Sequence, residues 1–248
     1  MSEVVHYAVE GPVATLTLDS PHNRNALSRQ LVTELFAGID RAEADDDVKV
    51  VLLTSAGSVF CSGADLSEAS GGGMEEGTRR IVELQRRVVA STKPFVSRVT
   101  GAVRAGGIGI VAATDVAVAT TNSTYALTEV RLGLAAATIS LTVLPRMTSR
   151  AAARTFLTGE TFDGRAAAGI GLVTLAVPEH EIDAEVDRIV TDLCKGHPQG
   201  LREAKRLVNA AMLDGIERDG EAVAELSAQL FASDAARETM LAFLSRGK

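Results

Sequence analysis

The sequence has few of the residues that build disulfide frameworks or metal sites. Its 248 residues include two cysteines, Cys61 and Cys194, which are too few for a disulfide framework or a cysteine-rich zinc site. The four histidines are scattered and form no H-x-x-x-H or H-E-x-x-H pair, so we expect no metal site. Sparse cysteine is typical of a reducing compartment, and we expect a cytoplasmic protein.

Long apolar runs and basic clusters are also missing. Charges interrupt the apolar stretches well before the ~18 residues that a transmembrane helix needs. The first residues show no basic segment followed by an apolar one, so no secretory signal is predicted. A net charge of −7 disfavours nucleic acid and anionic membranes as partners, because both bind clustered Lys and Arg.

Patterns typical of strands and helices alternate along most of the chain. Residues 4–10 and 13–19 predict a hairpin, and Ser28 is expected to cap a helix that ends near Ala44. Such alternation predicts an α/β fold. Further segments are expected as strands at 49–54, 94–100 and 115–120, a loop at 70–73, a turn, helix and return strand at 157–173, and helices at about 76–90, 201–214, 219–231 and 233–245. We therefore divide the chain into a core, 1–197, and a helical region, 198–248.

Paired glycines stand where the segment GAVRAGGIGIVAATD, residues 101–115, passes from a strand into an apolar helix. The chain contains no G-x-x-x-x-G-K-[ST] and no G-x-S-x-G, and these glycines do not give G-x-G-x-x-G. A helix start leaves N–H groups unpaired, and Gly106 could therefore donate to a developing oxyanion. Taken alone, the spacing of these glycines favours close backbone packing at the turn.

Two other segments carry candidate chemistry. In FCSGADL, residues 60–66, the backbone N–H of Ala64 could point into a cleft, while Asp65 is expected to cap the following turn. Glu129 lies between Leu127 and Val130, and a carboxyl group in such apolar company tends to have the raised pKa that suits an acid/base. The alternative is that Glu129 is an ordinary solvated surface residue without a catalytic role.

Taken in order and spacing, these segments resemble the enoyl-CoA hydratase/isomerase (crotonase) family. The resemblance covers nearly the whole chain and includes SPHNRNALS at 20–28, VVLLTSAGSVFCSGADLSE at 50–68, TYALTEVRLGL at 124–134 and LTGETFDGRAAAGIGLV at 157–173. It implies an α/β spiral of ββα units with a C-terminal helical trimerisation region, assembled as a homotrimer or a hexamer. It also implies an acyl-CoA thioester substrate and no separate cofactor, because coenzyme A belongs to the substrate.

The resemblance assigns roles to individual residues. Ala64 and Gly106 match the two backbone donors that hold the thioester oxygen, and Glu129 matches one of two catalytic glutamates. Arg24, Ala26, Asp65 and Leu66 fall in segments that contact coenzyme A in this family.

The chain departs from the family pattern at two positions. Where the first glutamate is expected, three residues after Gly106, it has Gly109. Arg104 stands where the family more often has an apolar residue; its stem could pack while its charge reaches water or an interface, or it could bind a substrate carboxylate or a CoA phosphate.

Gly109 leaves three interpretations open. The leading one is an enoyl-CoA hydratase of fatty-acid or branched-chain acid catabolism, in which Glu129 is the acid/base and a second group, such as a loop acid (Glu68, Glu75 or Glu76), helps to hold the water. The second is a Δ3,Δ2-enoyl-CoA isomerase, in which Glu129 shuttles a proton between carbons. The third is an acyl-CoA-binding protein without turnover.

Overall fold

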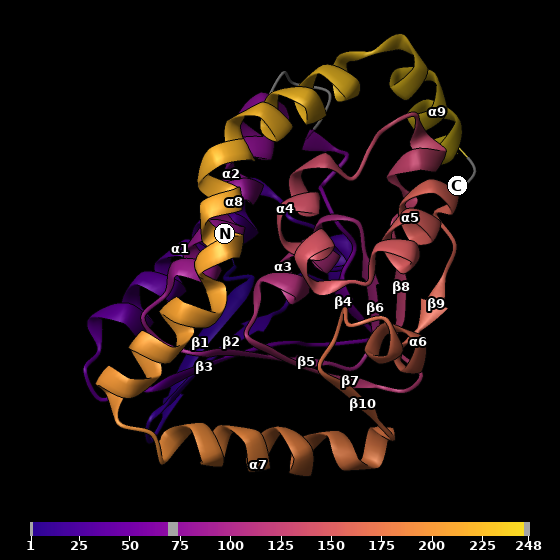
Figure 1. Ribbon diagram of the computed structural model, residues 1–248. Coiled ribbons are helices and arrows are strands. Elements are labelled where there is room, and N and C mark those ends of the chain that lie inside the picture. The colour runs from indigo at the N-terminus through magenta and orange to yellow at the C-terminus, as the bar shows by residue number, and fades with distance from the viewer. Residues whose placement is uncertain (1, 69–73, 246–248) are drawn as a thin grey trace.

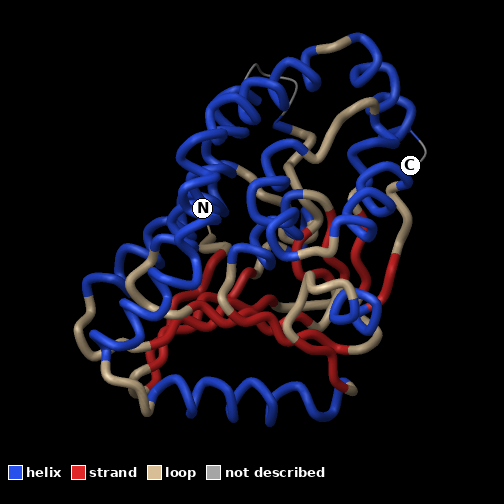
Figure 2. Tube along the Cα trace, viewed as in Figure 1, coloured by secondary structure: helices blue, strands red, loops and turns tan. Residues whose placement is uncertain are grey.

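The computed structural model of the chain describes residues 2–68 and 74–245. The loop predicted at 70–73 lies outside the described residues. The strands form two sheets, and helices cover both faces of the larger sheet (Figures 1 and 2). Helix α7, Ile182–Cys194, crosses one face of that sheet, and the other helices lie on the opposite side (Figure 1).

The larger sheet has six strands in the order β1-β2-β3-β5-β7-β10. The pair β1 and β2 is antiparallel and forms the predicted hairpin, and every other neighbouring pair is parallel. The strands are β1 (Val5–Glu10), β2 (Val13–Leu18), β3 (Val50–Ser55), β5 (Phe95–Val99), β7 (Val116–Thr120) and β10 (Leu175–Val177). Strands were therefore predicted correctly at 49–54, 94–100 and 115–120.

The smaller sheet has four short strands in the order β4-β6-β8-β9. They are β4 (Val59–Cys61), β6 (Ala102–Arg104), β8 (Thr124–Ala126) and β9 (Phe162–Asp163), and only the pair β8 and β9 is antiparallel. Three times in succession a strand of the larger sheet is followed by one of the smaller sheet and then by a helix. This repeat is the spiral of ββα units that the resemblance implied, and the predicted fold class is confirmed.

Helices connect the turns of this spiral. Helix α1 begins after Ser28, whose side chain accepts a hydrogen bond from the Leu31 amide as the predicted cap. The described helices up to α6 are η1 (Pro21–Asn23), α1 (Arg29–Ala44), α2 (Met74–Ala90), α3 (Gly106–Ala113), η3 (Thr128–Leu132), α4 (Ala137–Arg146), α5 (Ser149–Thr158) and α6 (Gly164–Gly169). A short turn of helix, η4 (Glu179–Glu181), precedes α7. The helix and return strand expected at 157–173 are α6 and β10, the strand following two residues beyond that range.

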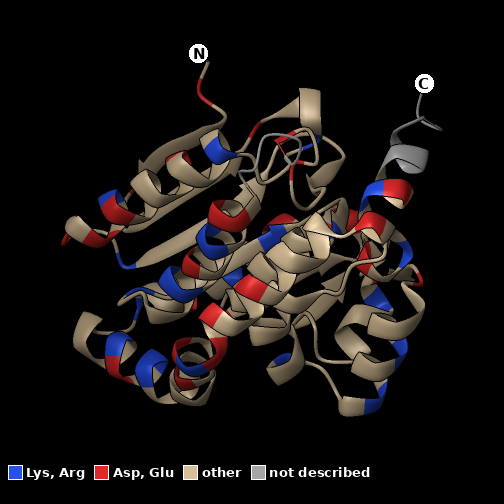
Figure 3. Cartoon of the chain, turned by 90° about the horizontal axis from the view of Figure 1, so that it is seen from above, with Lys and Arg blue, Asp and Glu red and all other residues tan. Residues whose placement is uncertain are grey.

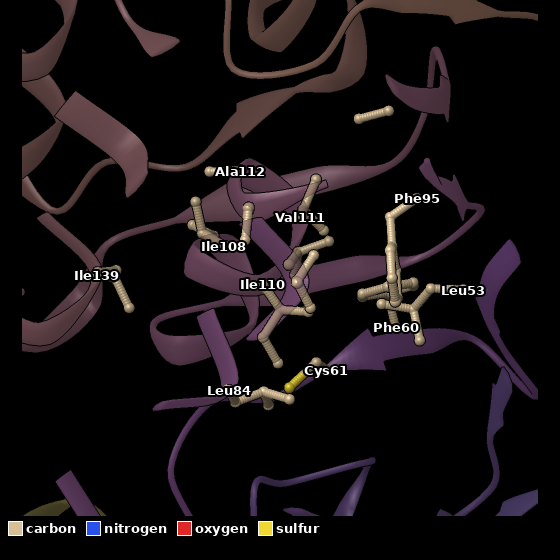
Figure 4. Packing of buried hydrophobic residues seen from close by; sticks show 14 of the residues in the cluster. Leu53, Phe60, Cys61, Leu84, Phe95, Ile108, Ile110, Val111, Ala112 and Ile139 are labelled. Carbon is tan, nitrogen blue, oxygen red and sulfur yellow. The ribbon is translucent and has the colours of Figure 1, made fainter. Parts of the chain in front are cut away.

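Helix α3 lies in the centre of the core, and all eight of its residues are buried. Figure 4 shows its side chains among apolar residues from β3, β4, β5, α2 and α4. A Cβ on Gly107 would lie 2.7 Å from the Cβ of Cys61, so this glycine lets α3 pack directly on β4. Burial raises the pKa of the Cys61 thiol to about 12, which makes it an inert core residue.

The C-terminal region corrects one expectation. Instead of separate helices at 201–214 and 219–231, a single helix α8 runs from Pro198 to Ala232, and α9 (Asp234–Ser245) follows. Gly215, which lies between the two predicted helices, and Gly220 are both inside α8. A Cβ on Gly220 would lie 3.1 Å from Val82 of α2, so the glycine permits close packing of the two helices. That packing outweighs the cost of about 1 kcal/mol that glycine imposes on a helix.

Charged residues of both signs are interspersed along the helices (Figure 3). Lys205 of α8 is buried instead, and its ammonium group lies 2.8 Å from the carboxylate of Asp115. Lys205 also donates hydrogen bonds to the carbonyl groups of Val88 and Lys93 at 2.8 and 2.9 Å. These contacts fasten α8 to the spiral.

Candidate active site

The three candidate catalytic groups follow the ends of three neighbouring parallel strands. Ala64 comes three residues after β4, Gly106 two residues after β6, and Glu129 three residues after β8. Because β4, β6 and β8 are parallel and adjacent, their carboxyl ends meet at one edge of the smaller sheet. Ligands of parallel sheets bind at this edge, and the topology brings the three groups to it.

Two backbone amides lie side by side at this edge. A Cβ on Gly106 would lie 3.8 Å from the nitrogen of Ala64, and a Cβ on Gly63 would lie 3.4 Å from the nitrogen of Gly106. Across residues 2–68 and 74–245, neither the Ala64 amide nor the Gly106 amide donates a hydrogen bond. Gly106 is the first residue of α3, whose dipole adds positive potential at this point. Two free, adjacent N–H groups can bind one oxygen atom that gains negative charge.

The backbone is strained directly before Gly106. Ala105 has φ 47° and ψ −123°, in a region that residues with a side chain rarely adopt. Its amide donates to the Ala126 carbonyl at 3.2 Å, and its carbonyl accepts from Ile108 at 2.9 Å. Such conformations cost about 1–3 kcal/mol and cluster at functional sites. Here the strain turns the chain sharply from β6 into α3 and leaves the Gly106 amide free.

Glu129 is part of the short helix η3. Its Oε2 atom is buried and has no hydrogen-bond partner among the described residues. Burial raises the pKa of Glu129 to about 7, so the carboxyl group can both take up and release a proton near neutral pH. The sequence also allowed Glu129 to be a solvated surface residue, but its Oε2 atom is buried.

Two glycines let other elements pack on η3. Gly133 ends η3 with φ 72°, and a Cβ there would lie 3.3 Å from the backbone of Ala235 at the start of α9. From α9, the Thr239 hydroxyl donates to the Leu132 carbonyl at 2.7 Å. On the other side, a Cβ on Gly159, which follows α5, would lie 3.1 Å from the Leu127 carbonyl oxygen. The segment that bears Glu129 is therefore held between α5 and α9.

The space beside Gly109, the residue that replaces the family's first glutamate, is occupied by side chains from α4 and α2. A Cβ on Gly109 would lie 2.5 Å from Cγ2 of Ile139 and 3.0 Å from Oε1 of Gln85, and both of these side chains are fully buried. The Thr142 hydroxyl lies 2.7 Å from the same Gln85 oxygen and 2.9 Å from the Gly109 carbonyl oxygen. Ile139 lies among the apolar side chains of the core in Figure 4. A side chain at residue 109 would need this packing to move.

The loop acids considered as substitutes lie in surface contacts. Glu68 accepts from the Arg29 amide at 3.0 Å, and Glu76 pairs with the Arg29 guanidinium at 3.2 Å. Glu75 pairs with Arg79 at 2.8 Å, and its side chain is 66% exposed. A loop acid that helps Glu129 therefore stays a prediction, and it would have to leave these contacts.

The residues matched to coenzyme A contacts lie on two segments that touch each other. Leu27 and Ala64 form an isolated parallel bridge, which brings Arg24 and Ala26 beside Asp65 and Leu66. The side chain of Arg24 is exposed, whereas Ala26 is buried and can offer a ligand only its backbone.

Asp65 caps the following turn, as expected, by accepting from the Ser67 amide at 3.0 Å. It also accepts a hydrogen bond from Asn23 at 2.9 Å. Burial raises the pKa of Asp65, but the hydrogen bonds from Ser67 and Asn23 outweigh burial and hold this pKa below its ordinary value.

Arg104 is bound to its own sheet. Its guanidinium donates to the Thr124 carbonyl at 2.7 Å, to the Thr124 hydroxyl at 3.0 Å and to the Val103 carbonyl at 2.9 Å. Burial lowers the pKa of Arg104. The guanidinium is therefore held by Val103 and Thr124, and the residue stays partly exposed.

Some participants in this site carried no signal in the sequence. Leu27, Asn23 and Ile139 lie 37, 42 and 30 residues from Ala64, Asp65 and Gly109, on other elements, and only the fold brings them together. In the part of the chain that the structure describes, no cluster of His, Cys, Asp and Glu could hold a metal ion. None of the helices in that part is both long and apolar enough to cross a membrane.

Comparison with known proteins shows the family of the chain. The family model described as Enoyl-CoA hydratase/isomerase matches residues 8–248. A crystal structure of an enoyl-CoA hydratase from Mycobacterium avium is 50% identical, with a TM-score of 0.93 over 99% of this chain and 98% of that one.

Two curated relatives extend the comparison. A Thermus thermophilus protein named "Putative enoyl-CoA hydratase" is 34% identical over 88% of both chains. "Enoyl-CoA hydratase domain-containing protein 3, mitochondrial" from Rattus norvegicus is 28% identical over 84% of this chain and 76% of its own. Because mitochondrial proteins are among the relatives, the cytoplasmic location stays a prediction.

Proposed function

Because this chain belongs to the enoyl-CoA hydratase/isomerase family, we propose that it is an enzyme that adds water to a 2-enoyl-CoA thioester. The observation that carries the proposal is the buried, unpartnered Oε2 of Glu129, at the same sheet edge as two free amides. A binding protein without turnover gains nothing from a buried carboxyl group whose pKa is about 7. Coenzyme A enters as part of the substrate, and the proposal includes no separate cofactor.

The amides of Ala64 and Gly106 would hold the thioester oxygen. As a nucleophile adds to carbon 3 of the 2-enoyl thioester, negative charge moves onto that oxygen and an enolate forms. Hydrogen bonds to this oxygen strengthen as the charge grows, so they favour the transition state over the bound substrate. One such donor typically contributes about 3 kcal/mol.

A single carboxylate can complete the addition. Ionised Glu129 takes a proton from water while the water oxygen bonds to carbon 3 and the double-bond electrons move toward the thioester. Glu129 then gives that proton to carbon 2, which restores the carboxylate and yields the 3-hydroxyacyl thioester. Because one group handles both events, we expect hydrogen and hydroxyl to add to the same face.

Isomerisation of a 3-enoyl-CoA is the second candidate, and the packing of Ile139 against Gly109 favours it. Glu129 would take a proton from carbon 2, the amides would hold the resulting dienolate, and Glu129 would return the proton to carbon 4. This reaction needs one carboxylate and no water. It is therefore not impaired by the lack of a second acid at residue 109.

Arg24 is proposed to bind the phosphate groups of coenzyme A, with backbone groups near Ala26, Asp65 and Leu66 lining the same segment. Arg24 is exposed and its hydrogen-bonding guanidinium suits a phosphate.

We further propose assembly as a homotrimer or a dimer of trimers through the C-terminal helices. Leu207 and Val208 of α8 are 69% and 73% exposed, which is unusual for adjacent apolar residues and suits a second copy of the chain. The molar mass from light scattering tests this assembly.

The absorbance of the conjugated thioester tests the reaction. With crotonyl-CoA, loss of the band indicates hydration; with a 3-enoyl-CoA, its appearance indicates isomerisation. Binding of both compounds without any change in absorbance would contradict enzymatic function.

A further inference from the structure

One peptide group connects the coenzyme A segment to the candidate oxyanion site. The Leu27 amide donates to the Gly63 carbonyl at 2.8 Å. That carbonyl belongs to the same planar peptide unit as the Ala64 N–H, and the two groups point in opposite directions. Leu27 therefore fixes the direction in which Ala64 can donate, and its hydrogen bond polarises the peptide so that this donor becomes stronger.

Leu27 contacts the second donor as well. A Cβ on Gly106 would lie 2.8 Å from Cδ1 of Leu27, so this side chain packs against the start of α3. A displacement of Leu27 would reach both amides of the candidate oxyanion site. Leu27 is 6% exposed and has little room to move independently of the segment that carries it.

The segment before Leu27 is fastened to the loop after β4. Ser62 donates from its amide to the Arg24 carbonyl at 3.2 Å and from its hydroxyl to the Asn23 carbonyl at 3.0 Å. A hydrogen bond between two side chains also joins them, from Asn23 Nδ2 to Asp65 Oδ2 at 2.9 Å. Gly63 and Asp65, the neighbours of Ala64, are thus both bonded to this segment.

Arg24 lies inside the fastened segment and is exposed. Both Arg24 and Asn25 have positive φ, 58° and 55°, which turns the Arg24 side chain outward while Asn25 stays buried. Asn25 anchors the turn by accepting from the Ser20 amide at 2.6 Å and donating to the Val59 carbonyl at 2.8 Å. A displacement of Arg24 on binding a ligand would therefore be transmitted through these hydrogen bonds to the loop after β4.

We propose that Asn23 and Asp65 are positioning residues that couple binding of the nucleotide end of coenzyme A at Arg24 to the placement of the Ala64 amide. This inference rests on the proposed function. Its physical basis is that binding energy from a remote part of a substrate can be used to organise the reacting centre, so a substrate without that part loses kcat. The Asn23–Asp65 hydrogen bond is the side-chain link through which the organisation would pass.

The test compares crotonyl-CoA with crotonyl-pantetheine, which lacks the nucleotide; the matching 3-enoyl pair is used if the wild type isomerises. Asn23→Asp sets two carboxylates against each other and breaks the link without a change of shape. The double variant Asn23→Asp with Asp65→Asn restores a hydrogen bond with the donor and acceptor exchanged. Asn122→Ala serves as a control, because Asn122 bonds at the surface to Glu179.

For Asn23→Asp we expect kcat with the coenzyme A thioester to fall about tenfold and kcat with the pantetheine thioester to change less than about twofold. The double variant should recover most of the loss, and Asn122→Ala should match the wild type. An equal fall for both thioesters would reveal a merely structural role, and no fall for either would remove the link; each result overturns the inference. A wild type that turns over both thioesters with equal kcat would overturn the coupling alone. A wild type inactive on all four thioesters would instead overturn the proposed function.

Discussion

Ile139 occupies the space that a side chain on Gly109 would need, with its Cγ2 atom 2.5 Å from the place of a Cβ at residue 109. The glycine and the isoleucine are therefore two halves of one packing arrangement. The absence of an acid at residue 109 is built into the core, and among the described residues Glu129 has the one buried carboxylate oxygen without a hydrogen-bond partner.

Gly109→Ala is expected to destabilise the fold by about 1–3 kcal/mol, because the added methyl group overpacks the contact with Ile139. In an Ile139→Ala background the added methyl group should cost much less, which a double-mutant cycle in urea unfolding measures. Gly215→Ala is the matched control, since nothing lies within 4 Å of a Cβ at that position of α8. That variant should gain up to about 1 kcal/mol from helix propensity. Equal effects of alanine at both glycines would contradict the packing described for residue 109.

The pH dependence of kcat/KM is expected to report Glu129. Burial raises the pKa of this carboxyl group from 4.5 to about 7, so it is protonated below that pH and ionised above it. A carboxyl group that acts as a base is active only when ionised. The rate should therefore rise with pH and level off above about pH 7. A limb near pH 4.5 would contradict the raised pKa, and a flat profile would show that Glu129 is not the titrating base.

Lys205→Met is expected to lower the free energy of unfolding by about 3–5 kcal/mol, because it leaves the carboxylate of Asp115 without its cation and frees two buried carbonyl groups. Lys195→Met is the control: Lys195 pairs with Asp192 at the same 2.8 Å distance, but its side chain is 71% exposed. We expect less than about 1 kcal/mol for that pair. Similar losses from both substitutions in urea unfolding would argue against a special role for the buried pair.

Much of this fold follows from local sequence. The hairpin at β1 and β2, the Ser28 cap and the strands β3, β5 and β7 each carry a pattern within a few residues. The C-terminal helices are different, because Gly215 and Gly220 locally favour a break and only the packing of α8 on α2 and α4 overrides it.

The site divides in the same way. Ala64, Gly106 and Glu129 follow strand ends within recognisable segments, so their roles could be predicted as a set. Ile139 and the Asn23–Asp65 link could not, since their function depends on contacts between segments 30 and 42 residues apart that share no local pattern.

The most direct test of the account is the turnover of Glu129→Gln beside that of the wild type, with crotonyl-CoA and with a 3-enoyl-CoA, together with the affinity of each protein for an acyl-CoA. Glu203→Gln is the control, because Glu203 pairs with Arg206 at the surface of α8. We predict that Glu129→Gln lowers kcat by about 10²–10⁴-fold, the usual contribution of a general acid/base, and leaves acyl-CoA affinity unchanged. Full activity of Glu129→Gln on the substrate that the wild type converts would contradict the assignment of Glu129 and, with it, the proposed mechanism.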